Sequence, residues 1–451
     1  MKYIPILDVH VGNAVAVWPS ITYAMNTAQF IAIDLELSGL GDRSKLASKC
    51  LEDRYAEIAS AAKSRSIISL GISCFRARKD KVPESRTQEF MIQTYNVLAL
   101  CSQPFTVEPQ ALKFLIQHGF DFNKQYQLGL PYKKAGEDHA ELEGCSLNNL
   151  FFALSAARKP IILHNGLVDL VFLYGNLYLE LPPKLLTFLA DVEDLFPAGI
   201  YDTKYLAEYH VRLKASYLQY VFQSCLKWNE DNNEPIKLEF PKQTTRNEDL
   251  YHVPLSEGIK EGDSWKTLRV CQQYAAHGWC KKGSECVESH DVSLIVSNDR
   301  LHRVSLKNKK RRLRLKERKK QRRLAKAANS DEDIECEESS RDVINLAMRG
   351  EGDDTAQTNG SGSEIDTASK THRYSENTQK CHRAGVDAFM TGLSYAVFSL
   401  QLVESSQNTN ELANKLYLSG KNLPLQVTKG NFGKLSAGHA LKSQLNSIAR
   451  S

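Results

Sequence analysis

The sequence predicts a mixed α/β domain. Apolar, strand-like runs at Phe30–Leu37, Ser66–Phe75 and Lys159–His164 alternate with helical stretches at Glu52–Lys63 and Leu167–Tyr178. This alternation is typical of a sheet that is covered by helices. The chain has 451 residues, of which 42% are hydrophobic, so it can build a sizeable core in one large domain with accessory parts.

Beyond residue 263 the composition changes several times along the chain. A Cys/His-rich unit, a basic tract and a segment rich in Ser, Thr, Gly, Asn and Glu follow one another, and a second apolar segment comes after them. We expect the polar segment to be disordered, because it has too few large apolar groups to offset its ordering entropy. The predicted parts are 1–263 (domain, first part), 264–295 (Cys/His unit), 296–328 (basic tract), 329–380 (disordered linker), 381–430 (domain, last part) and 431–451 (polar tail).

The charge of the chain is unevenly distributed. The formal net charge is +5, and Lys307–Arg323 alone carries twelve Lys/Arg and one Glu, or +11, which leaves 5 − 11 = −6 for the rest. We expect no membrane span, because no run approaches about 18 apolar residues. The first residues lack a secretory h-region, so the cysteines outside the Cys/His unit are expected to be free thiols in a reducing compartment.

The run Phe30–Leu37 is the first to carry candidate site residues. Side chains alternate between the two faces of a strand, so Ile31, Ile33, Leu35 and Leu37 share one face, and Asp34 and Glu36 share the other. Two adjacent buried carboxylates are costly unless a cation lies between them. Taken alone, the pair also fits a strand whose polar face meets water.

Further candidate site residues lie beside apolar runs that follow Phe30–Leu37 in the sequence. Asp169 lies one turn into a helix among apolar neighbours, and Asp202 precedes a helix, where we expect it to act as an N-cap acceptor. His382 is expected on the loop that leads into a last helix, and Asp387 on the first turn of that helix. Four acids and a histidine, Asp34, Glu36, Asp169, Asp387 and His382, suit a two-metal phosphodiester hydrolase with Mg²⁺ or Mn²⁺ and a histidine base.

The order of these motifs resembles a known enzyme family. D-x-E on a strand, H-N with a following Asp, and H-x-A-G-x-D-A-x-M-T-G occur in the order of the DEDDh 3′-exonucleases, in the deadenylase branch typified by poly(A)-specific ribonuclease. The stretches FLIQHGFDFNKQ (Phe114–Gln125), ELSGL after Glu36 and YDTKY (Tyr201–Tyr205) are also similar to that branch. The resemblance covers about residues 20–430 apart from the linker.

The resemblance implies a fold, a metal arrangement and an activity. The fold would be a ribonuclease-H-like α/β domain with a mixed central sheet, completed by the helix after the linker. Asp34, Glu36 and Asp387 would hold the first metal, and Asp34 would also hold the second, with support from Asp169. The activity would be removal of 3′-terminal adenosines from RNA, with release of 5′-nucleotides, and the substrates would be the tails of small nuclear and other non-coding RNAs.

The Cys/His unit has the spacing of a zinc finger. Cys271, Cys280, Cys286 and His290 follow the pattern C-x8-C-x5-C-x3-H, which suits one tetrahedral structural Zn²⁺. His277 is a competing ligand, but His290 fits the spacing better. So small a unit depends on the metal for its folding free energy. The resemblance to CCCH fingers implies single-stranded RNA binding, for which the stacking and cationic candidates are Tyr274, Trp279, Lys281 and Lys282. A protein-binding knob is the alternative.

The basic tract fits a nuclear localisation signal or a nucleic-acid clamp, although charge runs are often merely solvated. Its candidate residues are Lys309, Lys310, Arg311 and Arg312. We therefore expect a protein of the nucleus and its bodies, such as the Cajal body, whose partners are RNA 3′ ends and an import receptor.

Two other functions remain open from the sequence. An RNA-binding adaptor on an inactive nuclease fold would retain the finger, but the intact acid set argues against it. A DNA exonuclease would share all of the metal chemistry.

Overall fold

The computed structural model describes residues 3–78, 87–135, 144–241, 249–255, 269–328, 383–406, 408–430 and 433–448. The chain forms two compact units. Residues Met1–Asp299 and Gln379–Ser451 together make the first, and Arg300–Thr378 make the second. The predicted linker at 329–380 lies outside the described residues.

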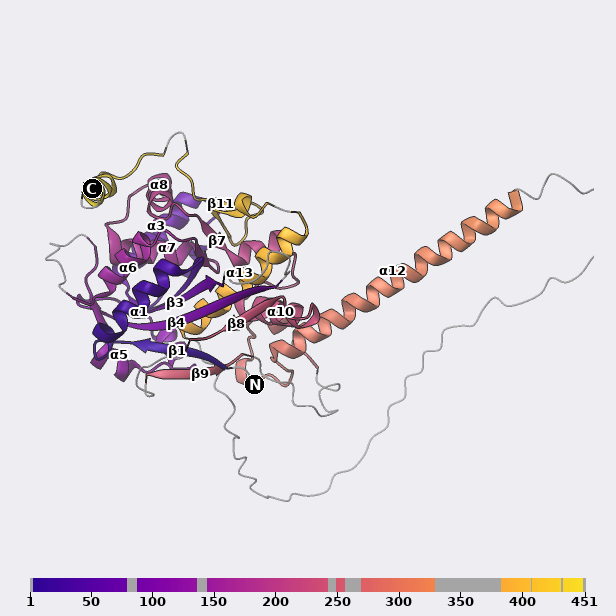
Figure 1. Ribbon diagram of the computed structural model, residues 1–451, viewed down its shortest axis with the longest axis horizontal. Helices are drawn as coiled ribbons and strands as arrows, with labels where there is room; N and C mark the ends of the chain where they lie inside the picture. Colours follow the sequence, from indigo (N-terminus) through magenta and orange to yellow (C-terminus); the bar gives the residue numbers. More distant parts are fainter. Residues whose placement is uncertain are drawn as a thin grey trace, which may run out of the picture. The chain divides into compact units, whose positions relative to one another are not determined.

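An 11-stranded mixed sheet forms the centre of the first unit (Figure 1). Its order is β11-β10-β7-β6-β2-β3-β4-β1-β9, and β5 and β8 also pair with β4. β2 runs antiparallel to β3 and parallel to β6, so the sheet mixes both pairings. The strands are β1 Tyr3–Val9, β2 Phe30–Leu37, β3 Ile67–Ala77, β4 Gln88–Cys101, β5 Leu130–Tyr132, β6 Ile161–Leu163, β7 Ile200–Asp202, β8 Ile236–Glu239, β9 Leu250–Pro254, β10 Lys415–Leu416 and β11 Leu425–Gln426. The predicted mixed α/β fold is confirmed.

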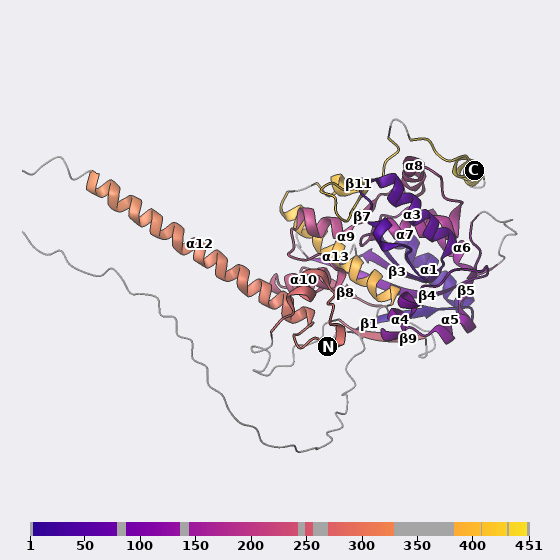
Figure 2. The same cartoon turned by 180° about the vertical axis from the view of Figure 1, so that it is seen from behind.

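Two apolar cores lie on opposite faces of this sheet. Ile31 and Ile33 of β2 pack into the first core with α1, α3, α6, α7 and α8, whereas Phe30 and Ala32 pack into the second with α10 and α13. The period-two alternation of β2 therefore sends Asp34 to the face that α13 covers. Views from the two sides show the helices over the sheet (Figure 1, Figure 2). These helices are α1 Ala14–Thr27, α3 Leu51–Ser64, α6 Leu147–Ala156, α7 Leu167–Leu173, α8 Leu185–Leu195, α10 Leu218–Asp231 and α13 Ala384–Glu404.

The remaining described helices are short, with one exception. They are α2 Arg43–Leu46, α4 Pro109–Gln117, α5 Phe122–Leu128, α9 Thr203–Tyr205, α11 Gln272–His277, α12 Val292–Ala328 and α14 Ala437–Ile448, with π-helical turns at Tyr174–Tyr178 and Leu206–His210 and 3₁₀ turns at Gly283–Glu285 and Thr409–Leu412. The long helix α12 contains the basic tract. The helix α14 lies in the segment 431–451, for which the sequence predicts a polar tail.

The helix α13 lies very close to the sheet. A Cβ atom placed on Gly71 of β3 would lie 1.9 Å from the carbonyl oxygen of Ala384, and one on Gly392 would lie 2.2 Å from the ring of Phe75. Both positions therefore need glycine. Among the described helices, α13 alone is long and apolar enough to cross a membrane, but 72% of its apolar window is buried inside the unit. Its apolar character is accounted for by its place in the second core.

Candidate metal centres

The strand β2 carries the first two acids of the site. Asp34 is paired in register with Gly71 of β3, and Glu36 with Ser69, so only small side chains neighbour them across the ladder. Both acids are partly buried. A register irregularity follows Glu36, and Ser38 then turns away, donating its hydroxyl to the carbonyl of Thr106 at 2.7 Å. The acids therefore stand at the end of a rigid element.

The helix α13 adds a third acid to this pair. Asp387 lies in its first turn and is 9% exposed. One carboxylate oxygen from each of Asp34, Glu36 and Asp387 lies within 4.8 Å of the others. The close contact of Ala384 with Gly71, directly opposite Asp34, holds the start of the helix against the acids.

The fourth acid, Asp169, belongs to the first turn of α7. The loop before this helix is held by Asp202, which accepts hydrogen bonds from the backbone N–H of Asn165 at 2.9 Å and of Gly166 at 3.3 Å. Asp169 is not part of the group of oxygens within 4.8 Å. It is nevertheless near enough that its charge raises the pKa of both Asp34 and Glu36.

The acids perturb one another strongly. Burial and then the charge of Asp387 raise the pKa of Asp34 and of Glu36 well above their ordinary values. Burial raises the pKa of Asp169 to about 7, and the charge of Asp202 adds to the shift. Within the described part of the chain, Asp34, Glu36 and Asp169 form no ion pair with a lysine or arginine. Joint ionisation of these carboxylates is therefore costly without a cation, and a cation bound between them would favour it.

The prediction for Asp202 is confirmed. It caps α9 by accepting hydrogen bonds from the backbone N–H groups of Lys204 and Tyr205, and it also accepts one from the N–H of Tyr417 beside β10. It is fully buried. Asp202 therefore joins the loop before Asp169 to the last part of the sheet. His382, by contrast, lies outside the described residues, and the next residue, Arg383, is the N-cap position of α13.

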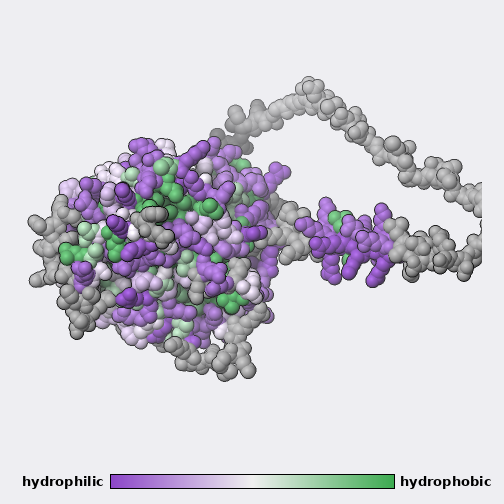
Figure 3. Space-filling model, turned by 90° about the horizontal axis from the view of Figure 1, so that it is seen from above, coloured by the Kyte–Doolittle hydropathy of each residue, from purple (hydrophilic) through white to green (hydrophobic). Residues whose placement is uncertain are grey.

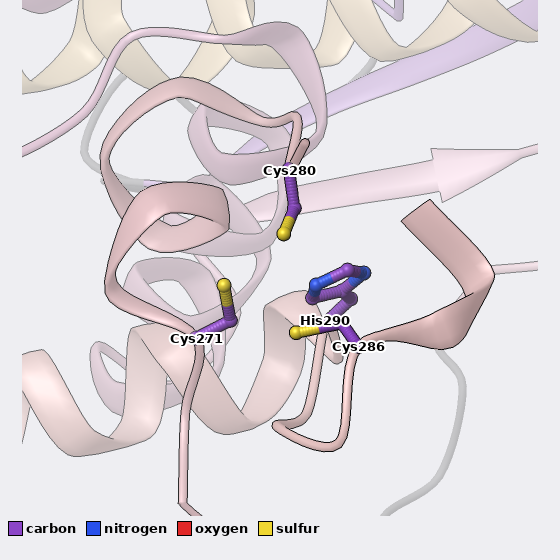
Figure 4. Close-up of side chains that lie close together, drawn as sticks. All are labelled: Cys271, Cys280, Cys286 and His290. Atoms are coloured by element: carbon purple, nitrogen blue, oxygen red, sulfur yellow. The ribbon is translucent and has the colours of Figure 1, made fainter. Parts of the chain in front are cut away.

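The Cys/His cluster brings its four predicted donors together. The sulfurs of Cys271, Cys280 and Cys286 and a ring nitrogen of His290 lie within 4.8 Å of one another. Figure 4 shows all four side chains pointing into one space, from a helix start, two loops and the segment before α12. Three thiols and one imidazole are the donors that a structural Zn²⁺ prefers, so the residues present fit that ion.

The RNA-binding candidates of this unit lie in different surroundings. Trp279 is 54% exposed, and Lys281 and Lys282 are exposed. The ring of Tyr274 stacks on the ring of His290, with centroids 4.3 Å apart and an angle of 9°. One face of Tyr274 is thus already occupied by a zinc-ligand candidate. A small apolar cluster then docks the unit on the domain, formed by Ala215, Tyr220, Val292, Ile295 and Val296 with Tyr217, Tyr274 and Ala275.

The basic residues of α12 are solvent-exposed. Lys309, Lys310, Arg311 and Arg312 all belong to an exposed stretch that continues to residue 322. This stretch is hydrophilic on its visible side apart from isolated leucines (Figure 3). Such a surface is available to an acidic or polyanionic partner.

Sequence reasoning missed a buried polar network beside the acid site. Asp8 of β1 is 5% exposed and contacts Asn96, Lys124 and Arg383. An acid within the apolar run Tyr3–Val9 was the available signal. Its partners come from β4, α5 and the start of α13, which only the folded topology brings together.

Comparison with known proteins gives several distant relatives. The chain is 29% identical over 126 residues to the poly(A)-specific ribonuclease of Arabidopsis thaliana and 25% identical over 140 residues to that of Danio rerio. These matches cover 25% and 29% of this chain, and 17% and 21% of the relatives. The chain thus matches less than a third of the length of these relatives.

The solved structures with similarity include Pop2p of S. pombe with bound Mg²⁺ and Mn²⁺ (17% identity, 49% of this chain, 82% of that chain, TM-score 0.37). The ribonuclease domain of yeast Pop2 is another (16% identity, 53% of this chain, 77% of that chain, TM-score 0.35). The model of the CAF1 family of ribonucleases matches residues 9–146 and 137–395, which together make up most of the chain. The protein therefore belongs to the CAF1 ribonuclease family.

Proposed function

We propose that this protein is a metal-dependent 3′→5′ exoribonuclease that shortens 3′ adenosine tails and releases 5′-nucleotides. The observation that carries the proposal is the convergence of Asp34, Glu36 and Asp387, whose carboxylate oxygens lie within 4.8 Å of one another. The chain that carries these acids belongs to a ribonuclease family. Such a mutually repelling group is costly to bury unless divalent cations bind it, and bound divalent cations are what phosphodiester hydrolysis of this class requires.

The donor set suits two divalent cations. Carboxylate oxygens are the ligands that Mg²⁺ and Mn²⁺ prefer. Asp34, Glu36 and Asp387 would hold one ion, and Asp34 with Asp169 would hold or support the other. Bound there, the cations would supply a lowered pKa for the attacking water and neutralisation of the charge that develops on the phosphate oxygens.

The chain's own residues would orient the reaction. The rigid pairing of β2 with β3 fixes Asp34 and Glu36, so the scissile phosphate would meet preorganised ligands. His382, which precedes Arg383 in the sequence, would accept the proton of the attacking water, as in the DEDDh class. We expect His382→Ala to lower kcat by about 10²–10⁴-fold with little change in Mg²⁺ affinity. Loss of Mg²⁺ affinity in calorimetry would make His382 a ligand and contradict this role.

The substrate class rests on resemblance and on the accessory parts. The order of acid motifs, CCCH finger and basic tract resembles the nuclear deadenylase called target of early growth response protein. We accordingly propose small nuclear and other non-coding RNAs as substrates, and the nucleus, including Cajal bodies, as the site of action. The exposed Lys309, Lys310, Arg311 and Arg312 would bind an import receptor.

The finger would bind single-stranded RNA next to the nuclease. Trp279 offers an exposed aromatic face, and Lys281 and Lys282 offer cations for phosphates. Because Tyr274 already stacks on His290, Trp279 is the stronger candidate for base stacking. We expect Trp279→Ala to weaken binding of single-stranded RNA without loss of zinc, whereas unchanged RNA binding would favour a protein-binding finger.

One assay tests the proposed reaction. The purified protein is incubated with Mg²⁺ and 5′-labelled RNA ending in A, U or C, beside DNA of the same sequence, and Asp34→Asn is the control for contaminating nuclease. Stepwise shortening of RNA ending in A, absent with Asp34→Asn and with chelator, is the expected result. Equal cleavage of DNA would favour a DNA exonuclease. RNA binding by the zinc-loaded protein without cleavage would favour an adaptor on an inactive fold.

A further inference from the structure

The start of α13 is attached to the sheet at three successive residues. The guanidinium of Arg383 pairs with Asp8 at 3.5 Å and lies over the ring of Tyr251 at 4.3 Å. Ala384 rests on Gly71. The N–H of Gly385 donates to the side-chain oxygen of Asn96 at 3.2 Å, which satisfies one of the donors that a helix start leaves open.

Asp8 is the residue that two of these attachments share. One of its oxygens accepts a hydrogen bond from the amide of Asn96 at 2.9 Å, and the other accepts one from Lys124 at 2.8 Å and faces Arg383. The amide of Asn96 is thereby oriented with its oxygen towards Gly385, because its nitrogen is held by Asp8. One buried carboxylate thus sets both the side chain of Arg383 and the acceptor for Gly385.

These contacts lead directly to the third acid. The carbonyl of Arg383 accepts hydrogen bonds from the N–H groups of Val386 at 2.8 Å and of Asp387 at 3.1 Å. A shift of Arg383 would therefore move the backbone of Asp387. Gly385 leaves no room for adjustment, since a Cβ there would lie 3.0 Å from the side chains of both Asn96 and Ile6.

We propose that Asp8 is a positioning residue for the nuclease site, which anchors the first turn of α13 through Arg383 and Asn96 and so fixes Asp387 among the metal ligands. Asp8 does not belong to the cluster of acids. Its single negative charge faces both Lys124 and Arg383, and the inference rests on the proposed nuclease function for its effect on rate. Partners behind a metal ligand typically contribute about 10–100-fold in metal affinity or activity.

The chain provides a matched control for this inference. Asp249 is a second acid of the same network, with partners His10 at 2.8 Å and Asn13 at 3.1 Å. Lys124 lies 3.9 Å from it. No contact described in the structure joins Asp249 to Asn96 or to Arg383. Asp249→Asn therefore changes the charge of the network but leaves the side chains of Asp8, Asn96 and Arg383, which attach α13, in place.

The test compares Asp8→Asn, Asp249→Asn and the wild-type full-length protein by hydrogen–deuterium exchange, Mg²⁺ calorimetry and kinetics. We expect Asp8→Asn to increase exchange in the first turn of α13 and to weaken Mg²⁺ binding. It should also lower kcat by about 10–100-fold, with KM for RNA little changed. We expect Asp249→Asn to leave exchange in that turn at the wild-type level. Equal effects of the two variants, or unchanged exchange and Mg²⁺ affinity in Asp8→Asn, would overturn the proposal.

A second variant tests the route through Arg383. Arg383→Met keeps an apolar stem over Tyr251 and removes the ion pair, so we expect it to reproduce part of the defect of Asp8→Asn. The double variant should be less impaired than the product of the two single defects, because the two changes remove one shared contact. Fully multiplicative defects would contradict this route. Exchange and calorimetry need no cleavage, so a wild-type protein that failed to cut RNA would refute the proposed function and leave the anchoring role to be decided by these two measurements.

Discussion

The two candidate metal centres of this chain are built in opposite ways. The acid cluster takes Asp34 and Glu36 from the middle of a sheet and Asp387, about 350 residues later in the chain, from a helix. The Cys/His cluster takes all four donors from the 20 residues between Cys271 and His290. The first site is therefore assembled by the fold of the whole domain, whereas the second would be held together largely by the ion that its donors fit.

The difference has an energetic side. The fold of the domain places repelling carboxylates together, and burial raises their pKa. Ionisation of these acids therefore destabilises the folded domain when no cation is bound. The Cys/His unit has few buried residues of its own, so we expect its folding to depend on a bound metal. Metal removal should therefore leave the acid site folded and should unfold the Cys/His unit.

Truncation after Lys380 is expected to have the largest effect. It removes α13 with its buried residues Phe389, Leu393 and Val397 from the second core, together with Asp387. Loss of several large apolar groups at about 2–5 kcal/mol each exceeds the stability of a typical domain. We expect an unfolded, inactive protein in thermal melting and nuclease assays, and a folded, active fragment would refute the view that the two parts form one domain.

Removal of the linker alone should have little effect in the same assays. Loop-closure entropy changes by only about 0.6 kcal/mol for each doubling of length. A protein that lacks residues 331–379 should therefore melt and cleave like the full chain, which makes it the control for the truncation.

Neutralisation of a single acid should separate activity from stability. We expect Asp34→Asn to lower cleavage by more than about 10³-fold, because a metal ligand is lost. The melting temperature without metal should stay the same or rise, because one buried charge leaves a repelling group. Near wild-type activity in a folded variant would show that the metal site is wrongly assigned.

For the candidate zinc ligands we expect the opposite: a substitution should affect local folding more than cleavage. We expect Cys280→Ser to lose bound zinc, measured by metal analysis, and to unfold the unit around it. The nuclease domain should melt only a few degrees lower, since the cluster around Tyr220 and Ile295 contributes a small part of its core. Short-RNA cleavage within about threefold of wild type is expected, and a complete loss would mean that the finger helps to build the acid site.

The pH dependence of the metal-free protein should be the smallest effect. The pKa of Asp169 is about 7 in the folded chain and about 4 when unfolded, so the folded state binds more protons between these values. Stability should therefore fall as pH rises from about 4 to 7, and Mg²⁺ should restore more of it at pH 8 than at pH 5. The check is the Tm of the metal-free wild type and of Asp169→Asn between about pH 4 and 7. If the Tm of the wild type rises over this range by as much as that of the variant, the raised pKa of Asp169 is contradicted.

The sequence was informative where a pattern is local. The alternation of strand-like and helical stretches along the chain predicted the mixed α/β fold, and the period-two pattern of Phe30–Leu37 placed Asp34 on one face with Glu36. The N-cap role of Asp202 was predictable because it depends on the next three residues. The Cys/His spacing is local in the same sense.

What the sequence left out depends on topology. Asp8 stands in β1, and its partners come from β4, α5 and the start of α13, so no spacing along the chain could have joined them. The stacking of Tyr274 on His290 was missed for a similar reason, because the sequence alone does not show whether an aromatic side chain is exposed or packs against a neighbour. The helix α14 was missed because it is polar outside its few buried contacts, such as the hydrogen bond of His439 with Tyr178 at 2.8 Å.

The late position of α13 has a consequence for the time course of synthesis. At about 5–20 residues per second, a ribosome that has made Glu36 needs roughly 18–70 s more to reach Asp387. The three-acid cluster cannot exist during that interval, because its last ligand has not been made. The proposed nuclease would therefore stay inactive beside its own messenger RNA until Asp387 has been made.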